Sequence, residues 1–342
     1  MARGKILVSG VKPTGKLHIG NYFGAMKQFL ELENEFDSHI FIADLHALTS
    51  VANRKELEDA TLEVIIDYLA IGLDPKKVTF YKQSDIPEVA ELAWIFGCLT
   101  TMPYLARAHA FKAAIEKYND AHPAQRSLAS KLEQLPPINM GVYTYPLLMA
   151  ADILVMDADI VPVGKDQVQH VEITREIART FNSKFGQVFK EPKEIVHEET
   201  MIVPGIDGRK MSKSYGNTIS LFASDEEIRT AVMSIPTDSR AVNEPKDMGN
   251  TVFAFHKLFT EGPEFEEVKD KYEAGGMGYK ESKEILIKNM IKFISPLRDK
   301  RAKLANDKDF VRTVLREGGK VARKQVEKKM KEVREKVGLT LK

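Results

Sequence analysis

Alternation of strand-like and helix-like segments over the first two thirds of this 342-residue chain is the feature that most constrains its fold. The strand-like segments, rich in β-branched and aromatic residues, are KILVS (5–9), HIFIAD (39–44), VTFYKQS (78–84), DIVPVG (159–164) and ETMIVPG (199–205). The helix-like segments between them are 21–36, 53–72, 88–99, 145–156 and 166–181. Strands that alternate with helices predict a Rossmann-like, doubly wound α/β fold around a parallel sheet.

Two departures from this alternation predict the domain organisation. The segment at about 106–140 is polar and helix-prone, and Pro123, Pro136 and Pro137 punctuate it, so we interpret it as an insertion between the two halves of the sheet. After residue 220 the strand pattern stops, and Ser224 with Glu227 has the form of a capping box that opens a helix. The sequence therefore predicts an α/β domain over 1–222 and an all-helical region over 223–342.

The C-terminal helices are predicted from apolar residues at helical spacing. These residues are Leu286, Met290, Ile294 and Leu297, and then Val326, Met330, Val333 and Val337. Eight Lys or Arg and three Glu lie between Lys320 and Lys336, while the whole chain carries a net charge of only +1. A polyanionic partner would therefore have to meet a local basic surface such as this one.

Cysteine, histidine and hydropathy exclude several classes of protein. Cys98 is the only cysteine, which excludes an internal disulfide and a cysteine-based zinc site. The eight histidines show no H-E-x-x-H spacing, so we predict no protein-held metal. No apolar run approaches the length of a membrane span, and the first residues do not have the pattern of a signal peptide, so we expect a cytoplasmic protein with no membrane contact.

The loop SGVKPTGKLHIGN (9–21) follows the first predicted strand and is typical of phosphate binding. Gly10, Gly15 and Gly20 permit a tight turn. The helix expected to begin near Ile19 would point free N–H groups at this turn, and the Thr14 hydroxyl can donate to a phosphate. The motif matches neither G-x-G-x-x-G nor the P-loop, and taken alone it is more often an ordinary glycine-rich turn.

The second loop, GRKMSKSYGN (208–217), places two lysines three residues apart between glycines. Lysine pairs are usually solvated, but Lys210 and Lys213 directly follow a predicted strand, and a glycine-framed loop can move to meet an anion. The two loops are about 190 residues apart. Their occurrence together in one α/β domain favours joint binding of a phosphate-bearing ligand.

Further candidate residues lie on one predicted helix and at one predicted turn. Tyr145, Met149, Asp152 and Ile153 share a helix face, and a buried carboxylate there is costly unless it is hydrogen-bonded. A hydrogen-bond donor on a bound ligand would be a suitable partner. Asp166 lies at a strand–helix junction, where it can either bind ribose hydroxyls or cap the helix.

The two loops together resemble the HIGH and KMSKS signatures of the class I aminoacyl-tRNA synthetases. The resemblance extends over nearly the whole chain and points to the bacterial-type tryptophanyl-tRNA synthetases. The matching segments are SGVKPTGKLHIGNYFGAMK, DLHALTS, QSDIPEVAELAWIF, YPLLMAADILVMDADIVPVGKDQVQHVEITREIARTFN, DGRKMSKSYGN and GGKVARKQVEKKMKEVREKVGL. It implies activation of L-tryptophan by ATP, with release of pyrophosphate, and transfer of tryptophan to tRNA(Trp).

The resemblance also implies the roles of individual residues. Catalysis is implied for Lys210, Lys213, His18 and Thr14. ATP contacts are implied for Lys12, Pro13, Thr14, Gly20, Asn21, Lys112, Gly164, Lys165, Asp166, Lys210, Met211, Ser212, Lys213 and Ser214. Tryptophan contacts are implied for Asp152, Tyr145, Met149, Ile153, Gln167, Val8, His46, Val161 and Val163. Asp152 would accept the indole N–H, while Tyr145 and Gln167 would hold the ammonium group.

The same resemblance implies a homodimer, Mg²⁺ carried by the ATP phosphates with no dedicated protein site, and anticodon recognition by the helical region. Two positions depart from the family pattern. Lys12 replaces a usual Gln and Lys165 a usual Glu, which makes the nucleotide site more cationic.

Three alternatives are open. A tyrosyl-tRNA synthetase shares fold and chemistry, but it typically has Gln where Met149 stands and G-G-S-D-Q where this chain has V-G-K-D-Q. A non-catalytic tRNA-binding paralogue would be expected to lose a signature lysine, the histidine or Asp152. A smaller nucleotidyltransferase of the H-x-G-H type seldom carries a K-M-S-K-S loop.

Overall fold

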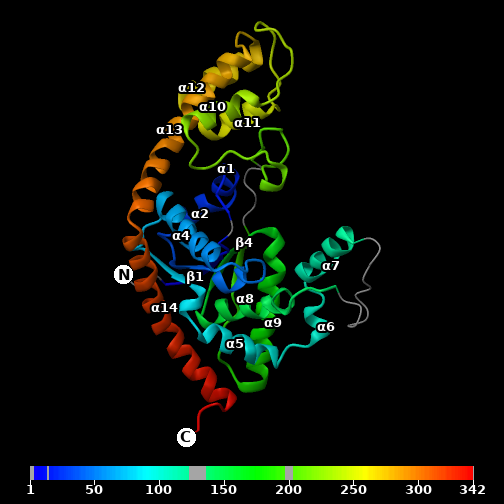
Figure 1. Ribbon diagram of the computed structural model, residues 1–342, viewed down its shortest axis with the longest axis vertical. Coiled ribbons are helices and arrows are strands. Elements are labelled where there is room, and N and C mark those ends of the chain that lie inside the picture. The colour runs from blue at the N-terminus through cyan, green and yellow to red at the C-terminus, as the bar shows by residue number, and fades with distance from the viewer. Residues whose placement is uncertain (1–3, 14, 123–135, 197–202, 342) are drawn as a thin grey trace.

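The computed structural model describes residues 4–13, 15–122, 136–196 and 203–341. Its centre is a sheet of five parallel strands in the order β3-β2-β1-β4-β5 (Figure 1). The strands are β1 (Ile6–Val11), β2 (Asp37–Ile42), β3 (Val78–Lys82), β4 (Ile160–Val163) and β5 (Lys193–Val196). The chain order reverses between β1 and β4, and this point in an open α/β sheet is where ligands characteristically bind. The predicted doubly wound α/β class is confirmed.

Helices cover both faces of the sheet. In the α/β domain they are α1 (Ile19–Asn21), α2 (Lys27–Leu32), α3 (Asp44–Ala47), α4 (Arg54–Ala70), α5 (Glu88–Gly97), α6 (Met102–Leu105), α7 (His109–Ala121), α8 (Met140–Val155) and α9 (Val168–Phe185). Alternate residues of a strand point to opposite faces, so Phe41 joins the core that contains α5, α8 and α9, while Ile40 and Ile42 join the core that contains α4.

Two predicted elements differ from the observed ones. The helix expected over 21–36 is divided into α1, a π-helical turn at Tyr22–Met26 and α2. The strand expected at 199–205 lies mostly outside the described residues, and Pro204 within it forms an isolated bridge with Lys210. The fifth strand is instead β5, a short, half-buried edge strand that lacks the apolar run of an interior strand.

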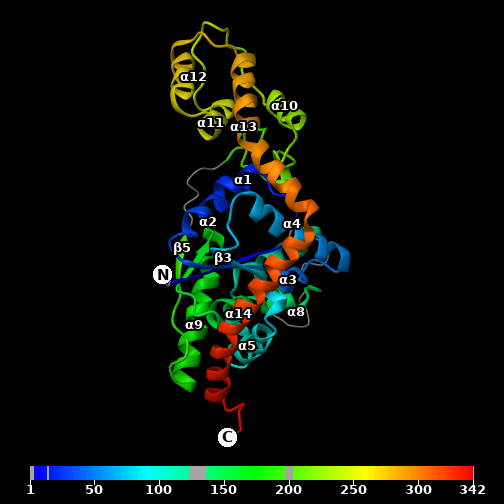
Figure 2. The same cartoon turned by 90° about the vertical axis from the view of Figure 1, so that its left-hand side faces the viewer.

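The helical region consists of α10 (Asp225–Ser234), α11 (Thr251–Phe259), α12 (Gly262–Ala274), α13 (Tyr279–Asn306) and α14 (Lys308–Val337). The predicted capping box is confirmed at the start of α10, because Ser224 Oγ accepts from Glu227 N at 3.2 Å and Glu227 accepts from Ser224 N at 2.7 Å. Helices α10 to α12 form a lobe at one end of the molecule, from which α13 and α14 run back along the α/β domain (Figures 1 and 2).

Helix α14 packs against the sheet rather than standing apart from it. The predicted apolar stripe is confirmed, since Val326, Met330 and Val333 are fully buried in the core of the α/β domain. Near its middle the helix crosses β3 so closely that a Cβ on Gly318 would lie 1.8 Å from the carbonyl oxygen of Phe80. The helix thereby covers the edge strand of the sheet, which would otherwise present unpaired backbone groups.

Several residues of the basic run bind the α/β domain instead of lying free. Arg334 pairs with Glu91 on α5 through its Nε at 2.8 Å, and Lys329 Nζ lies 2.9 Å from a carboxylate oxygen of Asp157. Among the residues that the structure describes, none belongs to a helix long and apolar enough to cross a bilayer.

Candidate active site

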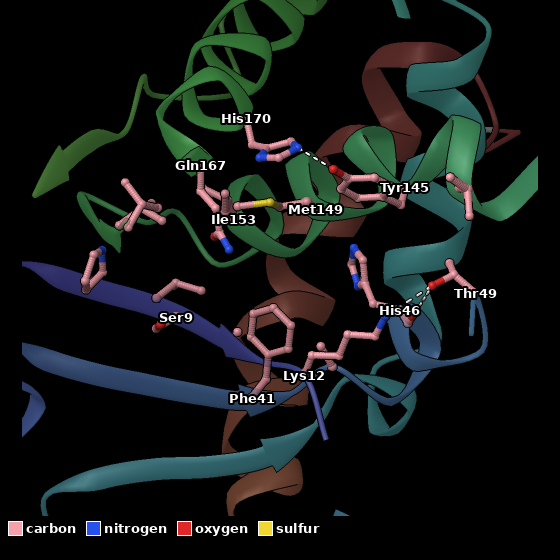
Figure 3. Close-up of a pocket in the computed structure, with 17 residues that line it drawn as sticks. Ser9, Lys12, Phe41, His46, Thr49, Tyr145, Met149, Ile153, Gln167 and His170 are labelled. Carbon is pink, nitrogen blue, oxygen red and sulfur yellow. Dashed lines mark hydrogen bonds between the residues drawn. The ribbon is translucent and has the colours of Figure 1, made fainter. Parts of the chain in front are cut away.

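A cavity of about 400 Å³ opens where the carboxyl ends of β1, β2 and β4 meet α8 and the start of α9 (Figure 3). The residues that line it are Val8, Ser9, Gly10, Lys12, Phe41, Ala43, His46, Thr49, Val142, Tyr145, Met149, Ile153, Val161, Pro162, Val163, Gln167 and His170. This set contains every residue predicted to bind tryptophan except Asp152. The walls are largely apolar with a few polar groups, as in sites for small organic ligands.

Asp152 lies behind the cavity wall, on α8 between the lining residues Met149 and Ile153. It is 3 % exposed, and its Oδ2 accepts a 2.7 Å hydrogen bond from Gln83 Nε2. Burial raises the pKa of this carboxyl well above its ordinary value, and the Gln83 hydrogen bond acts in the opposite direction. The carboxylate lies 3.9 Å from Nδ1 of His46, which does line the cavity.

A tyrosine–histidine pair forms another wall of the cavity. The Tyr145 hydroxyl lies 2.6 Å from Nε2 of His170, as the dashed line in Figure 3 shows. Either the hydroxyl or the imidazole can be the donor in this contact, according to the tautomer of His170. The sequence prediction included Tyr145 but missed His170, which follows Gln167 by three positions and so occupies the same side of the chain at the start of α9.

Lys12 is placed at the cavity itself, whereas the sequence predicted for it only a contact with ATP. It lines the cavity, and its Nζ donates to Thr49 Oγ1 at 3.3 Å. Thr49 in turn donates to the carbonyl oxygen of His46 at 2.7 Å. Partial burial lowers the pKa of Lys12 from its ordinary value. Its ammonium group therefore adds a cation at the junction of the cavity and the loop after β1.

The two signature loops lie side by side. Ile19 N donates to Ile219 O at 3.0 Å, and Gly20 N donates to Met211 Sδ at 3.4 Å. Met211 is buried in an apolar cluster that includes residues of α10, α11 and α13, and this packing anchors the lysine loop to the helical region. The tertiary fold thus joins two motifs that lie about 190 residues apart in the sequence.

His18 is a buried, uncharged group at neutral pH. Burial, aided by the nearby charge of Lys213, lowers the pKa of its imidazole to about 4. The backbone N–H of His18 donates to Asn21 Oδ1 at 3.1 Å, so the two predicted nucleotide contacts support one another. A neutral imidazole here can form hydrogen bonds with a nucleotide but does not add a positive charge.

Asn217 holds the lysine loop in shape and was not singled out from the sequence. It is buried, accepts from Ser212 N at 2.8 Å, and donates to Asp207 Oδ1 at 2.7 Å and to Lys210 O at 3.1 Å. A Cβ on Gly205 would lie 2.1 Å from its amide nitrogen, so the neighbouring backbone requires a glycine. These contacts leave Lys210 and Lys213 exposed at the surface.

Lys213 reaches toward the first loop. Its Nζ lies 2.9 Å from the position that a Cβ on Gly15 would occupy, and Gly15 has a φ of +64°. A side chain at position 15 would therefore both strain the backbone and displace the ammonium group. A phosphate lying over the turn would meet this cation and the free N–H groups of the first loop.

The other predicted ATP residues are placed as follows. Pro13 is buried after β1, Ser212 and Ser214 hydrogen-bond to each other at 2.9 Å, and Gly164 and Lys165 follow β4. Thr14 and the side chain of Asp166 lie outside the described part of the chain. Lys112 is exposed on α7 and is not among the described residues that line the cavity.

Comparison with known proteins agrees with this arrangement. A family model described as tRNA synthetases class I (W and Y) matches residues 2–295. The chain is 44% identical to a tryptophan–tRNA ligase of Fusobacterium nucleatum, over 97% of each chain, and 44% identical to one of Rhodopirellula baltica, over 93% of this chain and 94% of that one.

Solved structures give the same result. The crystal structure of Campylobacter jejuni tryptophanyl-tRNA synthetase complexed with ADP and tryptophan superposes with a TM-score of 0.86 at 39% identity, covering 97% of this chain and 99% of that one. A tyrosyl-tRNA synthetase of Archaeoglobus fulgidus superposes with a TM-score of 0.61 at 19% identity, covering 87% and 90%, a likeness of fold alone. The chain therefore belongs to the tryptophan–tRNA ligases, within the class I aminoacyl-tRNA synthetases.

Proposed function

We propose that this protein activates L-tryptophan with ATP to give tryptophanyl-adenylate and pyrophosphate, and then transfers tryptophan to the 3′ end of tRNA(Trp). The observation that carries the proposal is the position of an apolar cavity, backed by a buried carboxylate, at the foot of two joined phosphate-binding loops. The relatives named as tryptophan–tRNA ligases support the same reaction.

In the proposed reaction, the tryptophan carboxylate attacks the α-phosphorus of ATP in line, and pyrophosphate leaves from the opposite side. No covalent bond to the protein is needed, so catalysis depends on positioning and on stabilisation of charge. Lys210 and Lys213 would neutralise the departing pyrophosphate, since ammonium groups on flexible stems act as mobile point charges. His18 and Asn21 would hydrogen-bond to the nucleotide from the first loop.

In the amino-acid cavity, tryptophan would lie with its ring between Val8 and Met149 and its N–H toward Asp152. Tyr145 and Gln167 would accept from its ammonium group at the open end. A site that bonds a substrate N–H can reject analogues lacking it by a large factor, because its buried polar groups are then left unpaired.

Mg²⁺ would enter as part of the ATP substrate. The described side chains at the two loops are cationic or neutral, so they would not coordinate the ion. Mg²⁺ would be held by oxygen atoms of the ATP phosphates, some of which the lysines would leave uncontacted. We further propose a cytoplasmic homodimer in which the region 223–342 contacts the anticodon arm of tRNA. The lobe formed by α10 to α12 projects from the rest of the molecule, which suits this contact (Figure 1).

Amino-acid-dependent exchange between ATP and labelled pyrophosphate, measured across the twenty amino acids, tests the proposal. Tryptophan alone should support exchange. Exchange with tyrosine instead would establish the tyrosyl alternative, and exchange with neither would favour a non-catalytic paralogue.

A further inference from the structure

Gln83 is a fully buried amide that connects two polar residues of the candidate tryptophan site. It follows β3 directly, and its side chain is 0% exposed. Its Nε2 donates to Asp152 Oδ2 at 2.7 Å and lies 2.9 Å from His46 Nδ1. Its Oε1 accepts the backbone N–H of His46 at 3.2 Å. One side chain therefore contacts α3 and α8, on either side of the cavity wall.

The turn that carries Gln83 is itself held in place. The next residue, Ser84, donates its backbone N–H to Asp44 Oδ1 at 2.9 Å and its hydroxyl to Asp44 Oδ2. Asp44 is buried at the start of α3, the short helix that also carries His46. The backbone at Gln83 is thus fixed by hydrogen bonds between the segments that follow β3 and β2.

The number of N–H protons on the Gln83 amide limits which hydrogen bonds Asp152 and His46 can form. The amide has two N–H protons, and Asp152 and His46 Nδ1 can each take one. In that tautomer His46 carries its own proton on Nε2. The ring points into the cavity (Figure 3), hydrogen-bonds the backbone of Tyr145, and has its Nδ1 3.2 Å from Gln83 Oε1 as well. Asp152 in turn has one oxygen occupied, which leaves Oδ1 for a further donor.

We propose that Gln83 is a positioning residue for indole recognition: by binding Oδ2 of Asp152 it directs Oδ1 toward the substrate N–H. This inference rests on the proposed function, because it presupposes that tryptophan occupies the cavity. Gln83 would not touch the substrate. It would act by fixing an otherwise rotatable carboxylate, and a buried acceptor that is fixed in advance discriminates better than one that must reorient.

The test compares tryptophan with benzothienylalanine, in which sulfur replaces the indole N–H at nearly the same shape. Wild-type enzyme should prefer tryptophan in kcat/KM for pyrophosphate exchange by roughly 10- to 100-fold, the loss expected when a buried acceptor is left without its hydrogen-bond donor. In Gln83→Met, which keeps the length but removes the amide, the preference should fall to within about threefold. The fall should come from KM for tryptophan, with benzothienylalanine little changed.

A merely structural role for Gln83 would weaken both substrates equally and leave their ratio intact, which would overturn the proposal. Gln83→Leu provides a second variant with a side chain of similar size that offers Asp152 no N–H, and it should lose the preference in the same way. Gln325→Met is the matched control, since it removes a 2.7 Å bond from a glutamine amide to Met156 O outside the cavity. It should keep the wild-type ratio.

A structure of the wild-type enzyme with tryptophan gives a readout that no variant's folding can affect. The indole nitrogen should lie within hydrogen-bond distance of Asp152 Oδ1 while Gln83 still binds Oδ2. An indole bonded to Gln83 itself would overturn the inference but leave the proposed function standing. Absence of tryptophan-dependent exchange in the wild type would instead overturn the proposed function.

Discussion

Gly20 donates its backbone N–H to the sulfur of Met211 across 3.4 Å, although 191 residues separate them in the sequence. Gly20 lies in α1, the first helix after β1, and Met211 lies between the two lysines of the second loop. The contact brings the two signature motifs into one site. Met211 also packs with apolar residues of α10, α11 and α13, so the lysine loop is held against the helical region.

Replacing either loop lysine by alanine should reduce kcat/KM for pyrophosphate exchange by about 10²- to 10³-fold, the usual loss when one stabilising group is removed from a transition state. Lys210→Ala and Lys213→Ala should still bind tryptophan, as measured by calorimetry. Lys55→Ala, an exposed lysine on α4, is the control and should be fully active. Full activity in both loop variants would exclude the proposed role of the lysines.

Asn217→Ala should loosen the lysine loop without removing a charge. It deletes three hydrogen bonds that hold the loop, and each typically contributes about 1 kcal/mol to stability. We expect a rise of about tenfold or more in KM for ATP, with tryptophan binding unchanged. The control is Asn34→Ala, which replaces an exposed asparagine outside the lysine loop and should have wild-type kinetics. An equal rise in KM for ATP in this variant would show that the loss is not specific to the loop.

Gly318→Ala should destabilise the fold, because the added methyl group would overlap the Phe80 carbonyl where α14 crosses β3. Overpacking of this kind costs about 1–3 kcal/mol, which should lower the Tm by several degrees. Gly24→Ala is a suitable control, since a Cβ at that position meets nothing within 4 Å. If the two variants melt at the same temperature, the close crossing is absent in solution.

His256 should make stability depend on pH in the acid range. Its imidazole is fully buried between Thr260 Oγ1 at 2.8 Å and Ser282 Oγ at 3.0 Å, and burial lowers its pKa to about 4. Between pH 6.5 and 4 the unfolded chain binds a proton that the native protein does not, so stability falls as the pH falls, by up to about 3 kcal/mol.

Urea unfolding of wild type and His256→Gln at several pH values between 7 and 4.5 measures this effect. The variant should be less stable at pH 7 but should lose less stability on acidification. The exposed His122→Gln should follow the wild-type slope. Parallel slopes for wild type and His256→Gln would contradict the prediction.

Lys12→Gln and Lys165→Glu introduce the residues that the family resemblance leads us to expect at these positions. Both should raise KM for ATP, since each removes positive charge beside the proposed nucleotide site. Because Lys12 also lines the amino-acid cavity, its replacement should alter sensitivity to inhibitors that mimic tryptophan. Unchanged KM values for ATP would remove the idea that these cations tighten phosphate binding.

Much of the architecture could be predicted from the sequence, because it depends on local patterns. Periodicity located four of the five strands and the main helices, and Ser224 and Glu227 marked the start of α10 through a bond between near neighbours. The two loops and the aspartate on an apolar helix face were also visible, because their meaning lies in residue type and short spacing.

Only the tertiary structure decided which distant groups meet. Gln83, His170 and Asn217 are ordinary polar residues in the sequence, and each becomes part of the site through partners brought to it by packing. Basic residues of α14 likewise pair with the α/β domain because the helix returns across β3. Amphipathic periodicity states that a helix has a buried face, but which surface covers that face depends on contacts between segments that no local pattern encodes.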